Sequence, residues 1–302
     1  MNFRSLENEC GRPRPQQRRT SNRSRFLQRL THGHVAAPDD GRTPSEFLAA
    51  PKRVFKQALF TLSPFLLCLA TSFALPVFAG TTNSPPIFTG KLAYDPTSTY
   101  REQQILGWRV MVNKKLLAET NLCVRTLKLL ESQLAQVTNV IPTMPLEQLR
   151  QIPFWVERSS EQFPCMCYHE SYEWLRTHGV NPDKTGSVEL SSPENFLTWT
   201  KNQPWMVLHE LAHGYHKRVL GDNHAGIKRC YDHAKASGKY ESVLRAGKRE
   251  RHYALNNEKE YFAEATEAYF GRNDFQPFTR DELKEFDPEM FEMVRRVWQL
   301  PE

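Results

Sequence analysis

The chain lacks an excess of positive charge outside its N-terminal tail. Residues 1–56 hold twelve Lys and Arg against five Asp and Glu, a balance of +7. The formal net charge of the 302-residue chain is +6, so about −1 remains for everything after the tail. Because the basicity is confined to the tail, the sequence gives no basis for a nucleic-acid-binding surface. We therefore expect no nucleic-acid partner.

Charge is also absent from Gln57 to Gly90. The apolar part of this stretch follows a basic segment ending at Lys56, and small or modest residues close it at Ala79. A basic segment, an apolar segment and a small-residue cut site are typical of a secretory signal peptide. We predict a cut after Ala79 and hence a secreted or periplasmic, extracytoplasmic protein.

The alternative is that the same apolar segment stays as an uncleaved membrane anchor. It is about long enough, because a spanning helix needs ~20 apolar residues. Pro64 and Pro76 disfavour a permanent helix, so cleavage is the preferred interpretation. Both alternatives leave the basic flank inside and the remainder outside the cytoplasm. Membrane contact is thus expected only through an uncleaved anchor.

Composition divides the chain into four regions. Residues 1–56, basic and poor in apolar residues, are predicted to be a disordered extension, and residues 57–79 are the signal segment. Residues 80–99 are rich in Pro, Ser, Thr and Gly, which predicts a linker. Residues 100–302 contain no internal repeat and suit one α+β domain with a single core.

Four cysteines remain after the predicted cut: Cys123, Cys165, Cys167 and Cys230. An even number in an exported chain predicts two disulfides. A bond between Cys165 and Cys167 would close a strained ring, so we expect Cys123 and Cys230 each to bond one member of that pair. The alternative is four buried thiols.

Apolar spacing predicts the main elements. A helical pattern over 105–134 predicts one long amphipathic helix. Alternation around Phe154 and Val156 predicts a strand, and 186–190 (GSVEL) is a second short strand. Residues 278–300 have the pattern of helices that pack back on the domain. The expected fold is a small mixed sheet packed on a central helix, with a mainly helical C-terminal half.

That central helix carries the segment QPWMVLHELAHGYH. Pro204 suits its start and Gly221 its end. His209 and His213 are four residues apart, so both imidazoles lie on one face and can reach the same ion. Glu210 is rotated by about 100° from His209, which suits a water on the ion better than the ion itself. The pentad is short, and a helix with two ordinary histidines is the alternative.

A catalytic zinc ion takes three protein ligands and leaves a position for water. Val219 occupies the position where a metzincin has its third histidine, which excludes that class. A second predicted helix, 253–271, carries Glu260, Glu264 and Glu267 on one side among apolar and aromatic residues. Carboxylates in such surroundings need partners, and a metal ion with a histidine N–H behind it would supply them.

HELAH at 209–213 together with YALNNEKEYFAEA at 253–265 resembles the gluzincin metallopeptidases of the anthrax lethal factor catalytic-domain type, which also include the secreted Pro-Pro endopeptidases. The resemblance covers chiefly these two helices and the stretch between them. It implies a zincin-like metallopeptidase fold.

The resemblance also implies a role for each motif residue. Three residues would bind Zn²⁺: His209, His213 and Glu260. Glu210 would be the general base, and Tyr253 would donate to the developing oxyanion. Glu264 would orient a ligand histidine from the side away from the metal. A carboxylate in that place fixes the tautomer of the imidazole.

The sequence therefore predicts an exported zinc endopeptidase acting on a peptide or protein substrate. Enzymes of this shape align an extended peptide on an edge strand, and GSVEL is the candidate strand. Two alternatives stay open, namely a zinc-stabilised binding or regulatory protein without turnover and a zinc hydrolase of a non-peptide amide. The presence of Glu210 and Tyr253 argues against the first, since neither is needed to hold a metal.

Overall fold

A computed structural model describes residues 93–160 and 162–300 of the chain. The predicted extension, the apolar segment and most of the predicted linker lie outside these residues, so the structure does not test those predictions. Within the described part, no helix is both long and apolar enough to cross a membrane.

A five-stranded mixed sheet forms the first half of the domain, in the order β1-β2-β3-β5-β4. The strands are β1 (Tyr100–Ile105), β2 (Trp108–Asn113), β3 (Phe154–Val156), β4 (Met166–Tyr168) and β5 (Val188–Leu190). The β1–β2 and β4–β5 pairs are antiparallel, whereas β3 pairs in parallel with both β2 and β5. The two predicted short strands are therefore present, and β4 is the edge strand on the side of the motif helix.

The prediction of one helix over 105–134 is wrong for its first part. Leu106 and Gly107 have φ of 49° and 92°, so they form the tight turn of the β1–β2 hairpin. In β2 the alternate residues Trp108, Val110 and Val112 are fully buried, and this period of two was hidden in the helical pattern. The helices α1 (Lys114–Ala118) and α2 (Thr120–Val140) begin only after β2.

Helices cover the sheet on the side of the main core. They are α2, α3 (Thr143–Arg150), α5 (Pro193–Trp199) and α6 (Met206–Tyr215), while the short α4 (Tyr172–Thr177) belongs to the segment between β4 and β5. Phe154 and Val188 of the sheet share one apolar cluster with Leu130 of α2 and Leu208 of α6. The helix with the histidine pair therefore lies directly against the sheet, in contact with β4 and β5.

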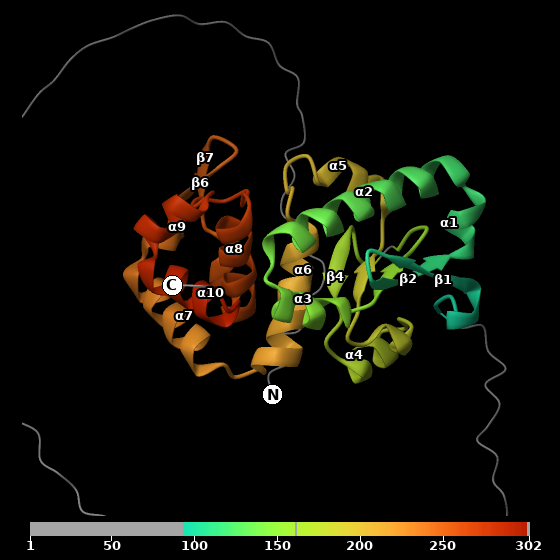
Figure 1. The fold of residues 1–302 in the computed structure, drawn as a ribbon, viewed down its shortest axis with the longest axis horizontal. Coiled ribbons are helices and arrows are strands. Elements are labelled where there is room, and N and C mark those ends of the chain that lie inside the picture. Colours follow the sequence, from blue (N-terminus) through green and yellow to red (C-terminus); the bar gives the residue numbers. More distant parts are fainter. Residues whose placement is uncertain (1–92, 161, 301–302) are drawn as a thin grey trace, which may run out of the picture. The chain divides into compact units, whose positions relative to one another are not determined.

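The C-terminal half is mainly helical. It contains α7 (Ala225–Ser237), α8 (Glu258–Phe270), α9 (Arg280–Phe286) and α10 (Pro288–Val297), with the hairpin of β6 (Val243–Arg245) and β7 (Lys248–Glu250). In its centre α8 contacts α6, α7, α9 and α10. Figure 1 shows α6 between the sheet and these helices. The predicted α+β fold, with a small mixed sheet on the motif helix, is confirmed.

The two predicted disulfides are not formed. Cys123, Cys165, Cys167 and Cys230 are all free thiols and all buried. Cys165 and Cys167, although close in sequence, pack in different surroundings. Cys165 belongs to the main core, whereas Cys167 packs with Phe163 and Leu175. The thiol of Cys230 lies 4.0 Å from the carbonyl oxygen of Glu289. Four buried thiols, the alternative above, describe the structure.

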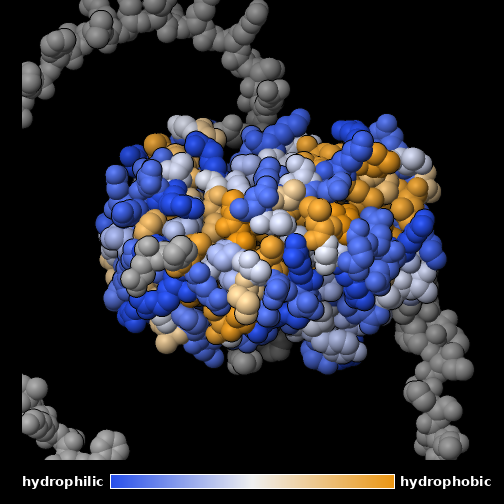
Figure 2. All heavy atoms as spheres, in the orientation of Figure 1, coloured by the Kyte–Doolittle hydropathy of each residue, from blue (hydrophilic) through white to orange (hydrophobic). Residues whose placement is uncertain are grey.

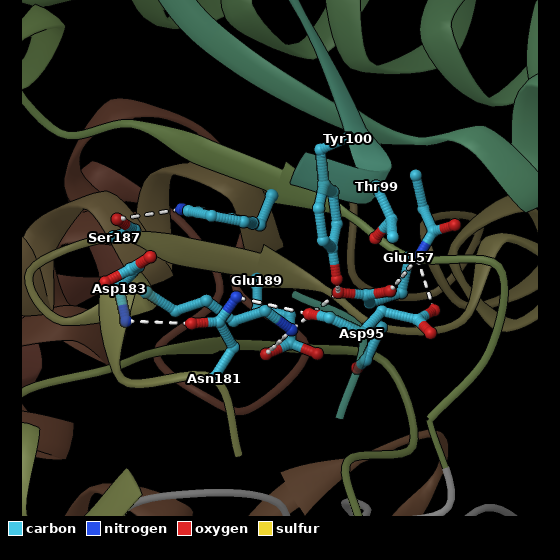
Figure 3. Close-up of polar contacts among 12 residues, drawn as sticks. Asp95, Thr99, Tyr100, Glu157, Asn181, Asp183, Ser187 and Glu189 are labelled. Atoms are coloured by element: carbon cyan, nitrogen blue, oxygen red, sulfur yellow. Dashed lines mark hydrogen bonds and ion pairs between the residues drawn. The ribbon is translucent and has the colours of Figure 1, made fainter. Parts of the chain in front are cut away.

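The second face of the sheet carries a buried charged network (Figure 3). The Nζ of Lys184 lies 2.6 Å from Glu157 Oε1 and 2.9 Å from Glu189 Oε2. The Tyr100 hydroxyl donates to Glu157, and the His169 Nε2 lies 2.6 Å from Glu189 Oε2. All five side chains are buried. The network ties β3 and β5 to the segment that follows β4, so it holds the edge strand in place.

Apolar side chains also reach the surface at the other edge of the sheet. Leu106 and Val124 are exposed, and they border a groove between β1 and α2 that Ile105 and Leu127 also line. Figure 2 shows the apolar side chains over this region. The groove lies at the edge opposite to β4 in the strand order.

Replacing Lys184 with Met should destabilise the domain strongly, because Glu157 and Glu189 would then stay buried without their cation. Breaking a buried pair in this way costs about 3–5 kcal/mol of unfolding free energy. Urea unfolding measures it. Arg109→Met is the control, since the Arg109–Glu102 pair is exposed and should contribute less than about 1 kcal/mol. Equal small losses in both variants would contradict a stabilising role for Lys184.

The same network predicts a dependence of stability on pH. Burial alone raises the pKa of Glu189, but the charge of Lys184 and the hydrogen bond from His169 lower it from 4.5 to about 2. The folded state therefore binds this proton more weakly than the unfolded state. Its contribution to the unfolding free energy is complete above pH 4.5 and is lost as the pH falls toward 2.

In that window the contribution of Glu189 should fall by at most about 1.4 kcal/mol per pH unit. Glu189→Gln should lack this slope while being less stable at neutral pH. Chemical unfolding between pH 2 and pH 6 measures both curves. Parallel curves for the two proteins would show that Glu189 does not titrate with folding.

Candidate metal centre

The helix α6 holds the histidine pair deep in the domain. Almost all of its residues are buried, and His209 and His213 are 4% and 7% exposed. Gly214 permits its close approach to the sheet, because a Cβ there would lie 2.5 Å from Ile152 and 3.0 Å from the Tyr168 ring. The chain then continues through a π-helical turn and leaves it at Gly221, with φ of 82°. Such turns occur often beside functional sites.

Glu260 is placed by the start of α8. The Asn257 side chain caps this helix by accepting hydrogen bonds from the backbone N–H groups of Lys259 and Glu260, each at 2.9 Å. At the other end a Cβ on Gly271 would lie 1.8 Å from the Trp205 ring, so only glycine lets α8 approach the start of α6 this closely. The cap thus fixes the start of α8 where Glu260 lies, and Gly271 lets the end of α8 pack against the start of α6.

The structure brings the two segments together. The Oε2 of Glu260 lies 3.1 Å from the Nε2 of His209 and 3.5 Å from the Nε2 of His213. One donor atom from each of the three residues lies within 4.8 Å of the others. Glu260 is 3% exposed. Three buried donors thus converge, although Glu260 follows His213 by 47 residues along the chain.

Behind His209 lies a carboxylate that the sequence interpretation did not assign. The Nδ1 of His209 lies 2.7 Å from Glu267 Oε1 but 3.7 Å from Glu264 Oε1. The structure thus places Glu267, not the predicted Glu264, at hydrogen-bonding distance. Both carboxylates are buried, and with His209 they form a second group of possible metal ligands. Seven residues bring a helix to within about 20° of its starting direction, whereas four leave it about 40° away. That spacing from Glu260 was the signal for Glu267.

Glu210 lies apart from this ligand group, as expected. Its Oε2 accepts a hydrogen bond of 2.9 Å from the backbone N–H of Tyr168 in β4. Burial raises the pKa of Glu210, and the opposing charges of His213 and His209 do not cancel the increase. The carboxylate is therefore held between the histidine pair and the edge strand.

The carboxylate of Glu260 and the imidazole of His213 shift each other's pKa toward the charged form. Burial alone would raise the pKa of Glu260, but His213 and His209 lower it well below its ordinary value. Burial alone would lower the pKa of His213, whereas the Glu260 charge raises it above 6.5. Each shift has the sign expected of a buried carboxylate in contact with imidazoles.

Tyr253 opens the 3-10 turn η6 (Tyr253–Asn256), which packs against the start of α8. Its side chain is half-buried, and its role as a donor stays a prediction. The preceding His252 is buried; its Nδ1 accepts a hydrogen bond of 3.0 Å from the Ala254 N–H, and its ring stacks on Phe275. His252 therefore stabilises the turn that presents Tyr253.

The other histidines of this part of the chain lie outside both ligand groups. His216 is buried against Phe262, and its two ring nitrogens have no hydrogen-bond partner among the described residues. Burial lowers its pKa to about 3. His224 caps α7, and His233 is an exposed partner of Glu289. None of the three competes with Glu260 as a third donor.

The prediction that GSVEL aligns a substrate is wrong. Its strand, β5, is paired on both sides, with β3 and with β4, so no edge remains for a peptide. The edge strand is β4. The backbones of Cys165 and His169 face β5, because they bond Ser191 and Ser187, whereas Tyr168 between them turns its N–H to Glu210. The outer side of β4 therefore faces the candidate site.

Fold and site together define an α+β domain with a buried His–His–Glu donor group, an edge strand, and a glutamate, Glu210, hydrogen-bonded to that strand. Residues 159–297 match the family model described as anthrax toxin lethal factor, N- and C-terminal domain. This stretch contains β4, α6 and α8, so the similarity to that family covers the segments that form the candidate site. The comparison with curated proteins gave no match, and the comparison with solved structures also gave none.

Proposed function

We propose that the chain is a zinc-dependent endopeptidase of the gluzincin type, acting outside the cytoplasm. One observation carries the proposal: the Glu260 carboxylate from α8 lies against both imidazoles of the His209–His213 pair on α6. The relation of residues 159–297 to lethal factor supports it. The family description covers both the N- and the C-terminal domain of lethal factor and so does not by itself name an activity. The proposed activity is therefore argued from the residues of the site.

The donor group fits a zinc ion. Two histidines and one glutamate are a known set for catalytic zinc, with bond lengths of about 2.0–2.2 Å. Two ligands of a tetrahedral ion at such distances lie about 3.4 Å apart. The Glu260 oxygen lies 3.1 and 3.5 Å from the two Nε2 atoms, so both of its separations are close to the required spacing, and all three donors lie within 4.8 Å of one another. The same distances are too short for three unprotonated donors without a shared cation or proton.

Bound zinc would supply Lewis acidity, and with it a water molecule acidic enough to give a nucleophile near neutral pH. The remaining chemistry belongs to side chains of the chain. Glu210 would take the proton of that water and give it to the leaving amine, the usual two tasks of a general base in amide hydrolysis. Its hydrogen bond with the Tyr168 N–H holds the carboxylate on the side of β4.

Three further side chains would act by orientation and charge, two of them behind His209 and the third near the reacting bond. Glu267 accepts from the His209 Nδ1–H, which fixes the tautomer with Nε2 available to the metal. Glu264 lies further from the same ring nitrogen, with Oε1 at 3.7 Å. Tyr253, at the start of η6, would donate its hydroxyl proton to the oxyanion, an effect typically of about 3 kcal/mol.

The substrate would be an extended peptide laid along β4. That strand is paired only with β5 among the described strands, so its outer backbone groups can add a further strand by main-chain hydrogen bonds. A protein that only binds zinc has no need of Glu210 beside an edge strand. This arrangement favours turnover over a purely structural metal site.

The test of the proposed function is cleavage of a diverse peptide library by the zinc-loaded protein, read by mass spectrometry. Glu210→Gln should lose cleavage by at least about 100-fold because the general base is gone. It should keep stoichiometric zinc, since Glu210 is not among the three donors. Zinc binding without cleavage by the wild-type protein would instead favour the binding or regulatory alternative. Cleavage retained by Glu210→Gln would reject the assigned base.

Zinc affinity separates the carboxylates of α8. Glu260→Ala should lose stoichiometric zinc, as a ligand is removed. Glu267→Gln should weaken zinc binding by about 10 to 100-fold, because the hydrogen bond that orients His209 is lost. Glu264→Gln, the matched control at 3.7 Å, should have the smaller effect. Competition with a chromophoric chelator measures all three, and the reverse order of Glu267 and Glu264 would contradict the assignment.

A further inference from the structure

One face of α2 presents a short stripe of side chains beside the groove at β1. The members of the stripe are Val124, Lys128, Glu131 and Ala135. Their spacing of four, three and four residues places them within about 60° of one another around the helix. The first three line the groove, which has a volume of about 380 Å³. The stripe therefore has two charged residues at its centre and an apolar residue at each end.

The two central charges of the stripe have no counter-ion in the described part of the chain. Lys128 and Glu131 are both exposed, and neither forms an ion pair with any described residue, including each other. By contrast, the exposed Lys228 on α7 is paired with Asp232 one turn further along that helix. The stripe thus holds one free charge of each sign, side by side at the rim of an apolar groove.

The turn between β1 and β2 adds an apolar side chain to the same groove. Leu106 is 42% exposed and has φ of 49°, and Gly107 follows with φ of 92°. A two-residue turn with both φ values positive favours Asn or Asp before the glycine, and a bulky residue in the left-handed region is strained. Both the solvent and the backbone therefore disfavour a leucine here in an isolated chain. A partner surface over Leu106 would offset this cost.

We propose that this surface is the interface of a homodimer, in which the α2 helices of two copies lie antiparallel across the groove. In a two-fold symmetric contact, a residue i that faces residue j of the partner also has j facing i. With Lys128 of one copy opposite Glu131 of the other, the stripe forms two ion pairs at its centre. The same register sets Val124 opposite Ala135 at both ends, because each lies four residues outside the central pair. The stripe is thus complementary to itself in charge and in apolar contact.

A second copy fits this stripe better than an unrelated charged partner does. A purely acidic or purely basic surface would match one of the two central charges and repel the other. In addition, β1 is paired only with β2 among the described strands, and a helix laid over such an edge is one way in which proteins protect it. The groove lies at the edge opposite to β4, so the dimer leaves the candidate metal centre open. The proposal therefore does not depend on the proposed function.

The experiment is sedimentation velocity of the full chain over the micromolar range, which should show a reversible equilibrium of monomer and dimer. Lys128→Glu and Glu131→Lys each replace two attractive contacts with two repulsive ones. Each should therefore raise the dissociation constant of the dimer about tenfold. An equimolar mixture of the two variants should form a mixed dimer about as tightly as wild type, because opposite charges then face each other again. Only a contact between two copies can produce this rescue.

Leu106→Asn tests the apolar part of the interface. Asparagine suits the backbone of this turn, so the domain should unfold at the same or a higher urea concentration while the dissociation constant rises. Lys228→Glu on α7 is the control, and it should leave the dissociation constant unchanged.

Three results would overturn the proposed dimer. The first is a monomer at every concentration, whatever else then covers the groove. The second is a dimer that both single charge variants leave intact, which would place the contact on another surface. The third is a mixture of the two variants that dimerises no better than either one alone. Zinc content and peptide cleavage should be the same in all of these proteins, so a failure of the proposed function is measured separately.

Discussion

The contact of Glu260 with His209 and His213 is the interaction on which the rest of the site depends. It requires α6 to pack closely on both the sheet and α8, and the sequence places a glycine at each of these two contacts. Gly214 lets α6 reach the sheet, and Gly271 lets the end of α8 reach Trp205 at the start of α6. Once the helices are this close, the three buried donors need a shared cation or proton between them.

The sheet has a second task, which is to bring an edge strand to the same place. Charged groups under its far face hold the strands, with Lys184 between Glu157 and Glu189 and with His169, the residue after β4, on Glu189. The main-chain N–H of Tyr168 then meets the Glu210 carboxylate. A base, a metal site and a surface for a peptide backbone therefore lie next to one another.

The sequence predicted the helices of the site well because their signals are local. Four-residue spacing put His209 and His213 on one face, and a carboxylate among apolar residues pointed to Glu260 as a group in need of a partner. Glu267 was missed because the distance from a ring nitrogen depends on how two helices cross. The same limit explains β2, whose alternation of Trp108 with Val110 was hidden within a longer helical pattern. Strand order, and thus the edge position of β4 instead of β5, is set by contacts across the chain that no local pattern encodes.

The most direct test of the central claim is X-ray absorption at the zinc edge of the zinc-loaded protein. The convergence of α6 and α8 predicts two imidazole nitrogens and one carboxylate oxygen at about 2.0–2.2 Å, with no sulfur in the first shell. The buried thiols near β4, Cys165 and Cys167, make sulfur a meaningful alternative. Sulfur scattering at about 2.3 Å, or a protein that holds no stoichiometric zinc, would contradict the account.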